Sequence, residues 1–455
     1  MRKRYIIEVI ESNQLTVLCP PALLKDKELK KIAFGSKSIE VDFLPHPDEK
    51  ENRIVISKGI QGAIYFPDFS IPLHIFIENQ VLFIGPLIGI FTAGFTPFPL
   101  RPIGERSSFF SKLLSVKKTV GALPFVFGEQ HIDWEQGTMK GYFFQENNWK
   151  IIEIPFPNVI YDRLPNRKSE RNPKLIKVKE RLQKDYLIPW YNPGFFNKLD
   201  INERLLQDPK VAEYLPETHP FTSFSVIEAM LSRYGHIYIK PINGSLGLGV
   251  HQIIYDKKQN DYFCRYQDRE GVNRLRKFST VEGLFKMVFA NQNLDRMLVQ
   301  QGIHLLRHES RSIDFRVHTN KDDLGNWHVT AIAAKIAGAG SVTTHLRSGG
   351  ETKTIAEIFS QDDCELYSEK LSHAALLLSE AIGKNMEGII GEIGFDLGLD
   401  KDGRVWLFEA NSKPGRSIFS HPELKHFDLL TRKLSIAFAV FLTEQSILYP
   451  EELFK

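Results

Sequence analysis

Hydrophobic and polar residues alternate near the C-terminus in a pattern that predicts two strands joined by a tight turn. The strands cover residues 391–399 and 404–411, and the segment Asp-Lys-Asp-Gly at 400–403 supplies turn residues. If Leu399 pairs with Arg404, the period of two places one set of apolar side chains on a core face: Phe395, Leu397, Trp406, Phe408 and Ala410. The opposite face then carries the polar side chains Glu392, Asp396, Glu409 and Asn411.

This polar face has two interpretations. Oxygen-bearing side chains on rigid strands, with Gly394 and Gly398 leaving room for a close approach, are typical of a Mg²⁺ site that phosphates complete. Acidic residues on a hairpin are also typical of a surface that simply faces solvent. A calcium loop of the EF-hand type is excluded, because its first ligand would be Gly398 and its flanks have strand patterns.

The apolar pattern divides the rest of the chain into regions. Residues 1–80 carry short apolar runs separated by turn residues and prolines, which predict an N-terminal β-rich domain. Residues 81–195 alternate strand and helix patterns, which predict a small α/β domain. Within it, residues 163–181 are polar and basic, which is typical of a linker or a surface helix. Residues 196–455 hold the remaining motifs and are expected to form a third domain.

A glycine-rich loop joins two predicted strands, residues 236–241 and 250–255. Its glycines are Gly244, Gly247 and Gly249. The loop matches neither a Walker loop nor a dinucleotide fingerprint, because both of those lead into a helix. Backbone N–H groups of such a hairpin can point at phosphate oxygens, and Lys240 would add a positive charge at its base. A flexible hairpin tip with an exposed lysine is the alternative.

Other polar positions lie on predicted strands and loops further along. Residues 297–303 form an apolar strand with two glutamines, which could face a purine edge or lie at the edge of a sheet. On the next strand Asp314, Arg316 and His318 alternate, so they share one face. Residues 341–351 form a polar loop containing His345 and Arg347, which is typical of a surface turn or of a site for an anionic intermediate.

Composition narrows the possible functions. The chain has 455 residues, enough for two or three domains with large cores. Lys plus Arg number 58 and Asp plus Glu number 55, a net charge of +3, which gives no indication of nucleic-acid or membrane binding. Three widely separated cysteines exclude a disulfide framework and a zinc cluster, so we expect a reducing, cytoplasmic location. The longest apolar run, residues 81–95, is shorter than the ~20 residues that a membrane span requires.

Three stretches resemble a known family. They are Asn192-Pro-Gly-Phe-Phe-Asn-Lys198, Leu215-Pro-Glu-Thr218 and Phe408-Glu-Ala-Asn-Ser-Lys-Pro-Gly415. The order of motifs is similar to that of the ATP-grasp superfamily, and these stretches resemble its YheC/YheD branch of endospore coat-associated proteins. The resemblance is specific from about 190 to 440, plausible from 81 to 190 and absent before residue 80. It implies an α/β ATP-grasp fold for residues 196–455.

The resemblance also implies roles for individual residues. The residues expected to contact ATP are Lys198, Lys240, Gly244, Ser245, Gly247, Gly249, Gln300, Gln301 and Ile303. The lysines would contact its phosphates, the glycine loop would cover them, and the last three residues would line the adenine site. Mg²⁺ would be held by Asp396, Glu409 and Asn411, and the transferred phosphoryl group would face Arg316 and Arg347. Lys335 and His345 stand where related ligases carry Arg and Asn, so the acceptor chemistry is either altered or lost.

The activity implied by this resemblance is that of an ADP-forming, Mg²⁺-dependent ligase. It would activate an unknown carboxylate as an acyl phosphate for attack by an amine or a thiol. The alternative is a nucleotide-binding component of the spore coat that serves in assembly without turnover, with coat proteins as its partners.

Overall fold

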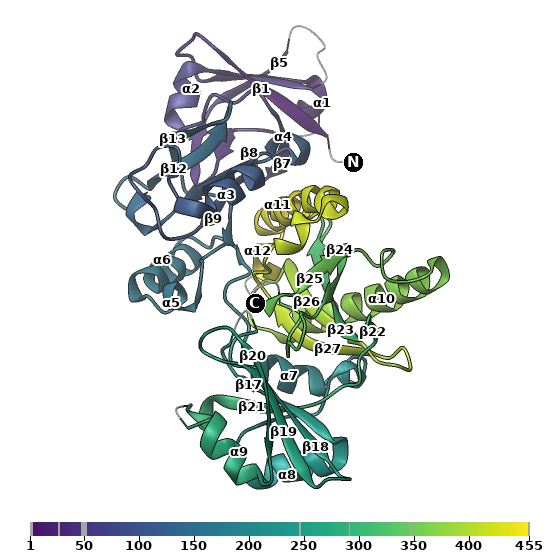
Figure 1. Cartoon of the computed structure of the whole chain (residues 1–455). Coiled ribbons are helices and arrows are strands. Elements are labelled where there is room, and N and C mark those ends of the chain that lie inside the picture. Colours follow the sequence, from purple (N-terminus) through teal and green to yellow (C-terminus); the bar gives the residue numbers. More distant parts are fainter. Residues whose placement is uncertain are drawn as a thin grey trace.

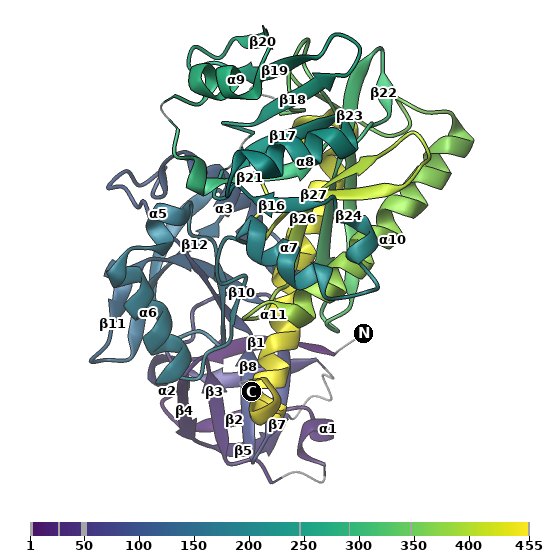
Figure 2. The same cartoon turned by 90° about the horizontal axis from the view of Figure 1, so that it is seen from below.

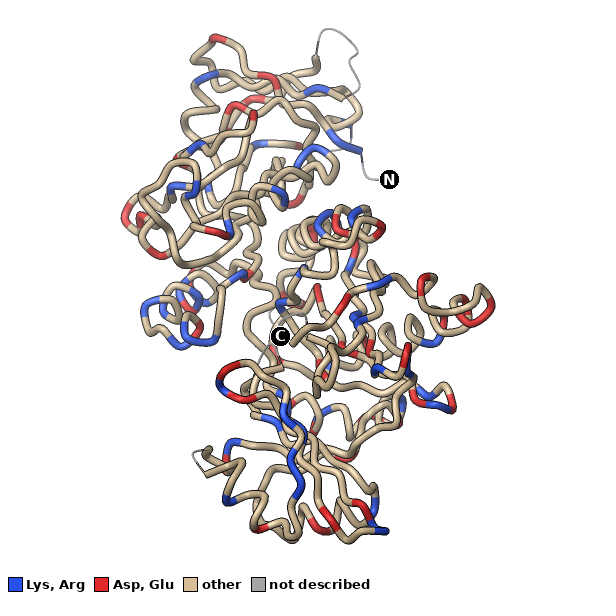
Figure 3. Tube along the Cα trace, viewed as in Figure 1, with Lys and Arg blue, Asp and Glu red and all other residues tan. Residues whose placement is uncertain are grey.

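The computed structural model describes residues 3–25, 28–46, 52–244, 247–290, 292–345 and 348–453. Within these residues the strands form four sheets, which follow one another along the chain (Figure 1). Lys and Arg are interspersed with Asp and Glu over all parts of the trace (Figure 3), as the balanced composition predicts. In the described part of the chain, no helix is long and apolar enough to cross a membrane.

The first sheet is mixed and has eight strands. Helices α1 (Pro21–Leu24) and α2 (Lys58–Ala63) accompany it. Its last strand in the sequence ends at Gly85, beyond residue 80, so we propose that the boundary between the first two domains lies between β8 and the next strand. The strands in sheet order are β4 (Lys37–Glu40), β3 (Lys31–Phe34), β8 (Val81–Gly85), β7 (Pro72–Glu78), β1 (Arg4–Ile10), β6 (Arg53–Ser57), β2 (Thr16–Cys19) and β5 (Asp42–Pro45).

The second sheet has a parallel centre, and its core is continuous with that of the first sheet. The basic segment after Arg163 forms α5 (Arg167–Glu170) and α6 (Pro173–Lys184) and not a linker, and α6 buries an apolar stripe. Helices α3 (Ser107–Leu114) and α4 (Lys117–Val120) cover one face. In sheet order the strands are β11 (Ile132–Asp133), β12 (Thr138–Gln145), β10 (Leu123–Phe127), β9 (Leu87–Phe91), β14 (Val159–Asp162) and β15 (Trp190–Tyr191), with β13 (Asn148–Pro155) paired to β12.

The third sheet is antiparallel and packs against α8 (Phe224–Tyr234) and α9 (Val281–Val288). Helix α8 ends at Gly235, whose φ of +73° is the left-handed conformation that terminates helices. The strands in order are β16 (Thr218–Pro220), β21 (Met297–Gln301), β17 (His236–Pro241), β18 (His251–Asp256), β19 (Asp261–Gln267) and β20 (Asn273–Phe278).

The fourth sheet is also antiparallel. Helices α7 (Lys198–Leu206) and α10 (Gln361–Asn385) pack on it, and α11 (Lys425–Leu448) runs from this sheet to the second sheet, where it shares a core cluster (Figure 2). A short α12 (Pro450–Leu453) follows. The strands in order are β25 (Glu351–Lys353), β24 (Trp327–Ile336), β23 (Arg311–Lys321), β26 (Glu392–Leu399) and β27 (Val405–Asn411), with β22 (Arg307–His308) paired to β23.

The C-terminal hairpin forms as expected, but its predicted register is wrong. Leu399 pairs with Val405, and the register shifts at Asp396 and Leu397. The turn is wider than predicted because the Asp400 carboxylate accepts hydrogen bonds from later backbone N–H groups. Three apolar residues therefore face the core from β27: Val405, Leu407 and Ala410. Two apolar residues expected there lie on the other face: Trp406, which donates a hydrogen bond to Asp400, and Phe408, which lines a cavity.

Candidate active site

A cavity of about 970 Å³ lies between the third and fourth sheets, and a segment between two strands of the second sheet lines part of it. This segment is residues 165–168, which follow β14 and include the first two residues of α5. Most residues predicted for the site line this cavity: Lys198, Lys240, Gly244, Gly247, Gln300, Gln301, Ile303, Arg316, Asp396, Glu409 and Asn411. Gly249 is not part of its lining, and Ser245 and Arg347 lie outside the described residues.

The glycine hairpin between β17 and β18 contacts Thr343, in the polar loop for which a role in binding an anionic intermediate was predicted. Gly247 has a φ of +70°, and a Cβ there would lie 3.0 Å from the Thr343 hydroxyl oxygen. Only glycine allows this approach without displacing Thr343. Gly249 has a φ of +72° and packs against Pro241, so it shapes the turn. The two loops therefore meet beside the cavity, although their predicted contacts with phosphate stay a prediction.

Lys240 is a partly buried lysine at the base of this hairpin. Its Nζ donates hydrogen bonds to the Gln300 side-chain oxygen at 2.6 Å and to the Phe408 carbonyl at 3.4 Å. Burial, reinforced by the charge of Lys198, lowers the pKa of Lys240 to about 7. The exposed-lysine interpretation of the loop is therefore wrong. An anion bound beside Lys240 would stabilise its ammonium form.

The depressed pKa of Lys240 predicts that nucleotide binding depends on pH. Above pH 7 the free protein holds Lys240 mostly neutral, whereas phosphate oxygens favour the ammonium form, so binding takes up a proton. We expect the Kd for an ATP analogue to rise by up to about tenfold per pH unit above 7 and to be level below it. Titration calorimetry in buffers of different ionisation enthalpy measures both the Kd and the proton uptake.

The matched control for this dependence is Lys240→Met. It should bind more weakly and lose the proton uptake, leaving only the titration of the nucleotide itself. Unchanged affinity in Lys240→Met would remove this lysine from the site.

The two glutamines of β21 hold neighbouring groups in place. Gln300 accepts from Lys240 and donates to the Thr218 hydroxyl at 3.0 Å, and the Gln301 side-chain oxygen accepts from the Glu217 N–H at 3.1 Å. Strand β21 lies between β16 and β17, so the edge-strand interpretation is wrong. Both glutamines line the cavity together with Ile303, and their adenine contact stays a prediction.

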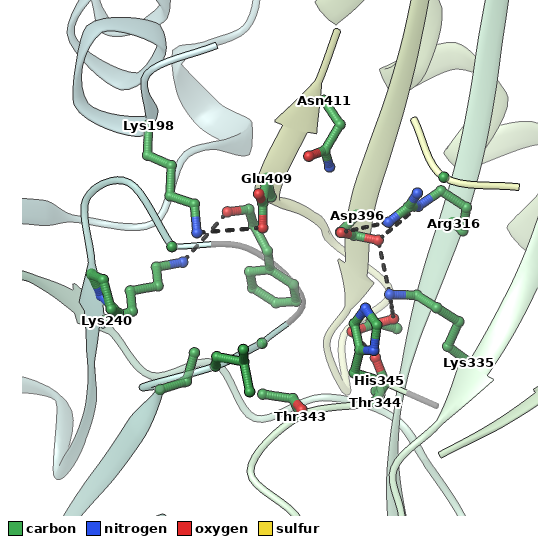
Figure 4. Close-up of a pocket in the computed structure, with 18 of the residues that line it drawn as sticks. Lys198, Lys240, Arg316, Lys335, Thr343, Thr344, His345, Asp396, Glu409 and Asn411 are labelled. Atoms are coloured by element: carbon green, nitrogen blue, oxygen red, sulfur yellow. Dashed lines mark hydrogen bonds and ion pairs between the residues drawn. The ribbon is translucent and has the colours of Figure 1, made fainter. Parts of the chain in front are cut away.

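A strip of charged side chains crosses four neighbouring strands of the fourth sheet (Figure 4). Lys335 of β24 lies 2.9 Å from Asp314 of β23 and 2.8 Å from Asp396 of β26. Arg316 of β23 donates two hydrogen bonds of 3.0 Å to the Asp396 carboxylate. Glu409 of β27 faces Asp396 in the register and lies on the strip's far end. The cross-strand pairing holds each of these charges in position.

The charges of the strip determine which groups stay ionised. Burial raises the pKa of Asp396, but Arg316 and Lys335 outweigh it and hold that pKa well below its usual range. Burial lowers the pKa of Lys335, and its two carboxylate neighbours more than offset this, so its pKa is raised. Burial also raises the pKa of Asp314, against the opposing effect of Lys335. Lys335 and Asp396 therefore stay charged at neutral pH.

Three predicted metal ligands project from adjacent, paired strands. Glu409 lies opposite Asp396, and Asn411 lies opposite Gly394, so their oxygens share one side of the hairpin. Among the described residues, Glu409 forms one ion pair, with Lys198 at 3.5 Å, and its side chain is 27% exposed. Two carboxylates and an amide are the donor types that Mg²⁺ takes when phosphates and water complete its shell. Among the described residues, no group of three or more His, Cys, Asp or Glu gathers as a metal cluster on its own.

Glu392, which was expected on the same polar face, belongs to a buried network instead. Its carboxylate accepts a hydrogen bond from the Tyr161 hydroxyl and pairs with Arg163 at 3.2 Å and Arg416 at 3.1 Å. The fully buried carboxylate faces the second domain because Asn192 binds the backbone of Glu392. The solvent-facing interpretation of the hairpin is therefore wrong for this residue.

Sequence reasoning missed the attachment of the loop that follows β27. Lys413 lies 2.7 Å from Asp162 and 2.8 Å from Glu170, and its side chain is only 3% exposed. Asn192 also donates a hydrogen bond to the Ser412 carbonyl. The cavity wall formed by Lys413 and its neighbours is thus held by the second domain. No local signal identifies Asp162 and Glu170, which lie more than 240 residues from Lys413 in sequence.

Comparisons with solved structures find ligases. The structures include the D-alanine-D-alanine ligase from Coxiella burnetii (13% identity, TM-score 0.42, 80% of this chain and 99% of that chain). They also include the D-alanine–D-alanine ligase from Bacillus anthracis complexed with ATP (11% identity, TM-score 0.44, 79% of this chain and 99% of that chain).

Comparisons of sequence find relatives with a higher identity to this chain than those solved structures have. The endospore coat-associated protein YheD of Bacillus subtilis (strain 168) is 41% identical over 453 residues, which cover 99% of each chain. The endospore coat-associated protein YheC of the same strain is 24% identical over 278 residues, which cover 60% of this chain and 75% of the relative. The family model described as YheC/D like ATP-grasp matches residues 187–442. The expected fold class is confirmed, and the chain belongs to the YheC/D-like ATP-grasp family.

Proposed function

We propose that this protein is an ADP-forming ligase that activates a carboxylate as an acyl phosphate and transfers the acyl group to an amine or a thiol. One observation carries the proposal. Two lysines, Lys198 and Lys240, line the same cavity as Asp396, Glu409 and Asn411. Cations opposite oxygen ligands in one cavity are what a polyphosphate with a divalent ion requires. The ATP-grasp family assignment is consistent with this chemistry.

In the proposed reaction a carboxylate oxygen of the substrate attacks the γ-phosphorus of ATP. The bond from that phosphorus to the bridging oxygen breaks, and ADP leaves with the bonding electrons. Lys198 and Lys240 would neutralise charge on the phosphates, and Arg316 would face the transferred group. An amine or thiol then attacks the acyl carbon, loses its proton, and displaces inorganic phosphate.

Mg²⁺ would be held by oxygens of Glu409 and Asn411, with Asp396 the third predicted ligand. When bound, it would neutralise charge on the phosphates and position them for transfer. The remaining steps depend on the protein's own groups, which bind and orient the two substrates.

The acceptor would occupy the part of the cavity beside Asp314 and Lys335 of the charged strip. Thr343, Thr344 and His345 line one wall there, and residues 165–168 with Arg416 line another. Thr344 donates a hydrogen bond of 2.6 Å to Asp314, which fixes this loop to the charged strip. A cavity of about 970 Å³ has room for a second substrate beside a nucleotide.

The second candidate is a nucleotide-binding component of the spore coat without turnover. The name of the relative that is 41% identical, an endospore coat-associated protein, favours a place in the coat of a sporulating cell, with coat proteins as partners. Nucleotide binding without turnover would also use Lys198 and Lys240, but it gives no reason for the charged strip of Lys335, Arg316 and Asp396 on the wall of the same cavity. We therefore favour the ligase, which is compatible with the same location.

The decisive experiment traps the acyl phosphate. Purified protein is incubated with ATP, Mg²⁺, hydroxylamine and a panel of carboxylates that includes amino acids, dipeptides and dicarboxylates. A ligase should release ADP and form a hydroxamate in equal amounts with the correct carboxylate. The control variant Lys401→Met, at the exposed hairpin tip, should give the same amounts of both products. ATP binding without ADP or hydroxamate across the whole panel would favour the coat component.

A further inference from the structure

Asp396 differs from the other two predicted metal ligands because protein cations already occupy it. Arg316 donates to both of its oxygens at 3.0 Å, and the Lys335 ammonium lies 2.8 Å from one of them. Three N–H donors thus use most of the lone-pair directions that a carboxylate offers. Glu409, by contrast, forms an ion pair with one described cation, Lys198 at 3.5 Å, and its side chain is more exposed, 27% against 15% for Asp396.

These cations cannot easily move aside for a metal ion. Arg316 lies directly opposite Asp396 in the strand register, and its two parallel hydrogen bonds match the fork of a guanidinium to a carboxylate. Lys335 is anchored on its other side by Asp314 at 2.9 Å, and Asp314 is held in turn by Thr344. Displacing Lys335 would leave Asp314 buried without its cation, which is costly in a protein interior.

A divalent ion placed on Asp396 would also lie within a few ångströms of two fixed positive charges. Repulsion between like charges at that distance opposes binding. Among the described residues, Glu409 forms an ion pair with one cation only, Lys198 of α7, which is expected to turn toward a phosphate. Lys240 and Arg316 also act on Glu409, but neither forms an ion pair with it.

We propose that the site binds a single divalent ion, on Glu409 and Asn411, and that the Lys335 ammonium takes the place of a second one beside Asp396. Asp396 then serves to hold Lys335 and Arg316 at the phosphoryl group. The inference rests on the nucleotide binding of the proposed function, but not on turnover. In this proposal Asp396 is not a metal ligand, in contrast to its predicted role.

Equilibrium dialysis tests this stoichiometry. Protein is dialysed against Mn²⁺ and a nonhydrolysable ATP analogue, and the excess of each on the protein side is measured. We expect one Mn²⁺ per bound analogue in the natural protein. Lys335→Ala removes the charge and opens space, so its ratio should rise to two, whereas Lys335→Arg keeps the charge and should stay at one.

The outcomes separate this inference from the function on which it rests. A ratio of two in the natural protein would overturn the single-ion site while leaving the ligase proposal intact. A ratio of one in folded Lys335→Ala would overturn the role of Lys335. If Lys335→Ala does not fold, the ratio in the natural protein and in Lys335→Arg still decides the stoichiometry. No retained analogue in the natural protein would overturn both proposals.

Discussion

Glu409→Gln is expected to lower ADP release by about 100-fold or more, the size of effect that follows removal of one preorganised electrostatic group. The side chain keeps its length and loses its charge, so the oxygen remaining beside Lys198 is a weak metal ligand. Glu409 is partly exposed, at 27%, so we expect little change in folding stability. The measurement is the initial rate of ADP formation with the carboxylate found in the trapping experiment.

The control for Glu409→Gln is Glu423→Gln, which makes the same chemical change at an exposed residue outside the cavity. It should retain the full rate. Excess Mn²⁺ should partly restore Glu409→Gln if the loss is one of metal affinity. A Glu409→Gln variant with the rate of the natural protein would exclude Glu409 from the reaction.

Lys413→Met is expected to lower the free energy of unfolding by about 3–5 kcal/mol, the usual cost of removing one partner from a buried ion pair. Asp162, 1% exposed, loses its cation but retains hydrogen bonds from the Trp190 indole and the Leu164 N–H. The wall of the cavity that carries Lys413 should loosen as well, because Asp162 and Glu170 attach it to the second domain. Urea unfolding followed by tryptophan fluorescence measures the change.

A double substitution separates the ion pair from simple packing. Lys413→Met combined with Asp162→Asn leaves no uncompensated charge at position 162, so it should be more stable than Lys413→Met alone. Lys401→Met, at the exposed hairpin tip, should stay within about 0.5 kcal/mol of the natural protein. Equal unfolding midpoints for Lys413→Met and the natural protein would contradict the expectation.

Patterns within short windows were sufficient for much of the site. The glycine spacing after Lys240 predicted a hairpin between two strands, and β17 and β18 form it. Alternation along residues 312–318 placed Asp314 and Arg316 on one face, and both line the cavity. These inferences succeed because side-chain direction in a strand depends on the local backbone alone. The family resemblance carried the same positions to an ATP-grasp fold, which the family model confirms.

The hairpin of β26 and β27 shows what local patterns do not predict. The sequence by itself determined two paired strands that carry Asp396, Glu409 and Asn411, but it did not determine the register shift at Asp396 and Leu397 that places Glu409 opposite Asp396. Only the tertiary structure decided that Asp396 meets Arg316, 80 residues earlier, and that Glu392 meets Arg163, 229 residues earlier. The order of strands in a sheet and the packing of domains bring such partners together. A carboxylate in a sequence therefore identifies a possible ligand, whereas the cations around it in the fold determine whether it can bind a metal.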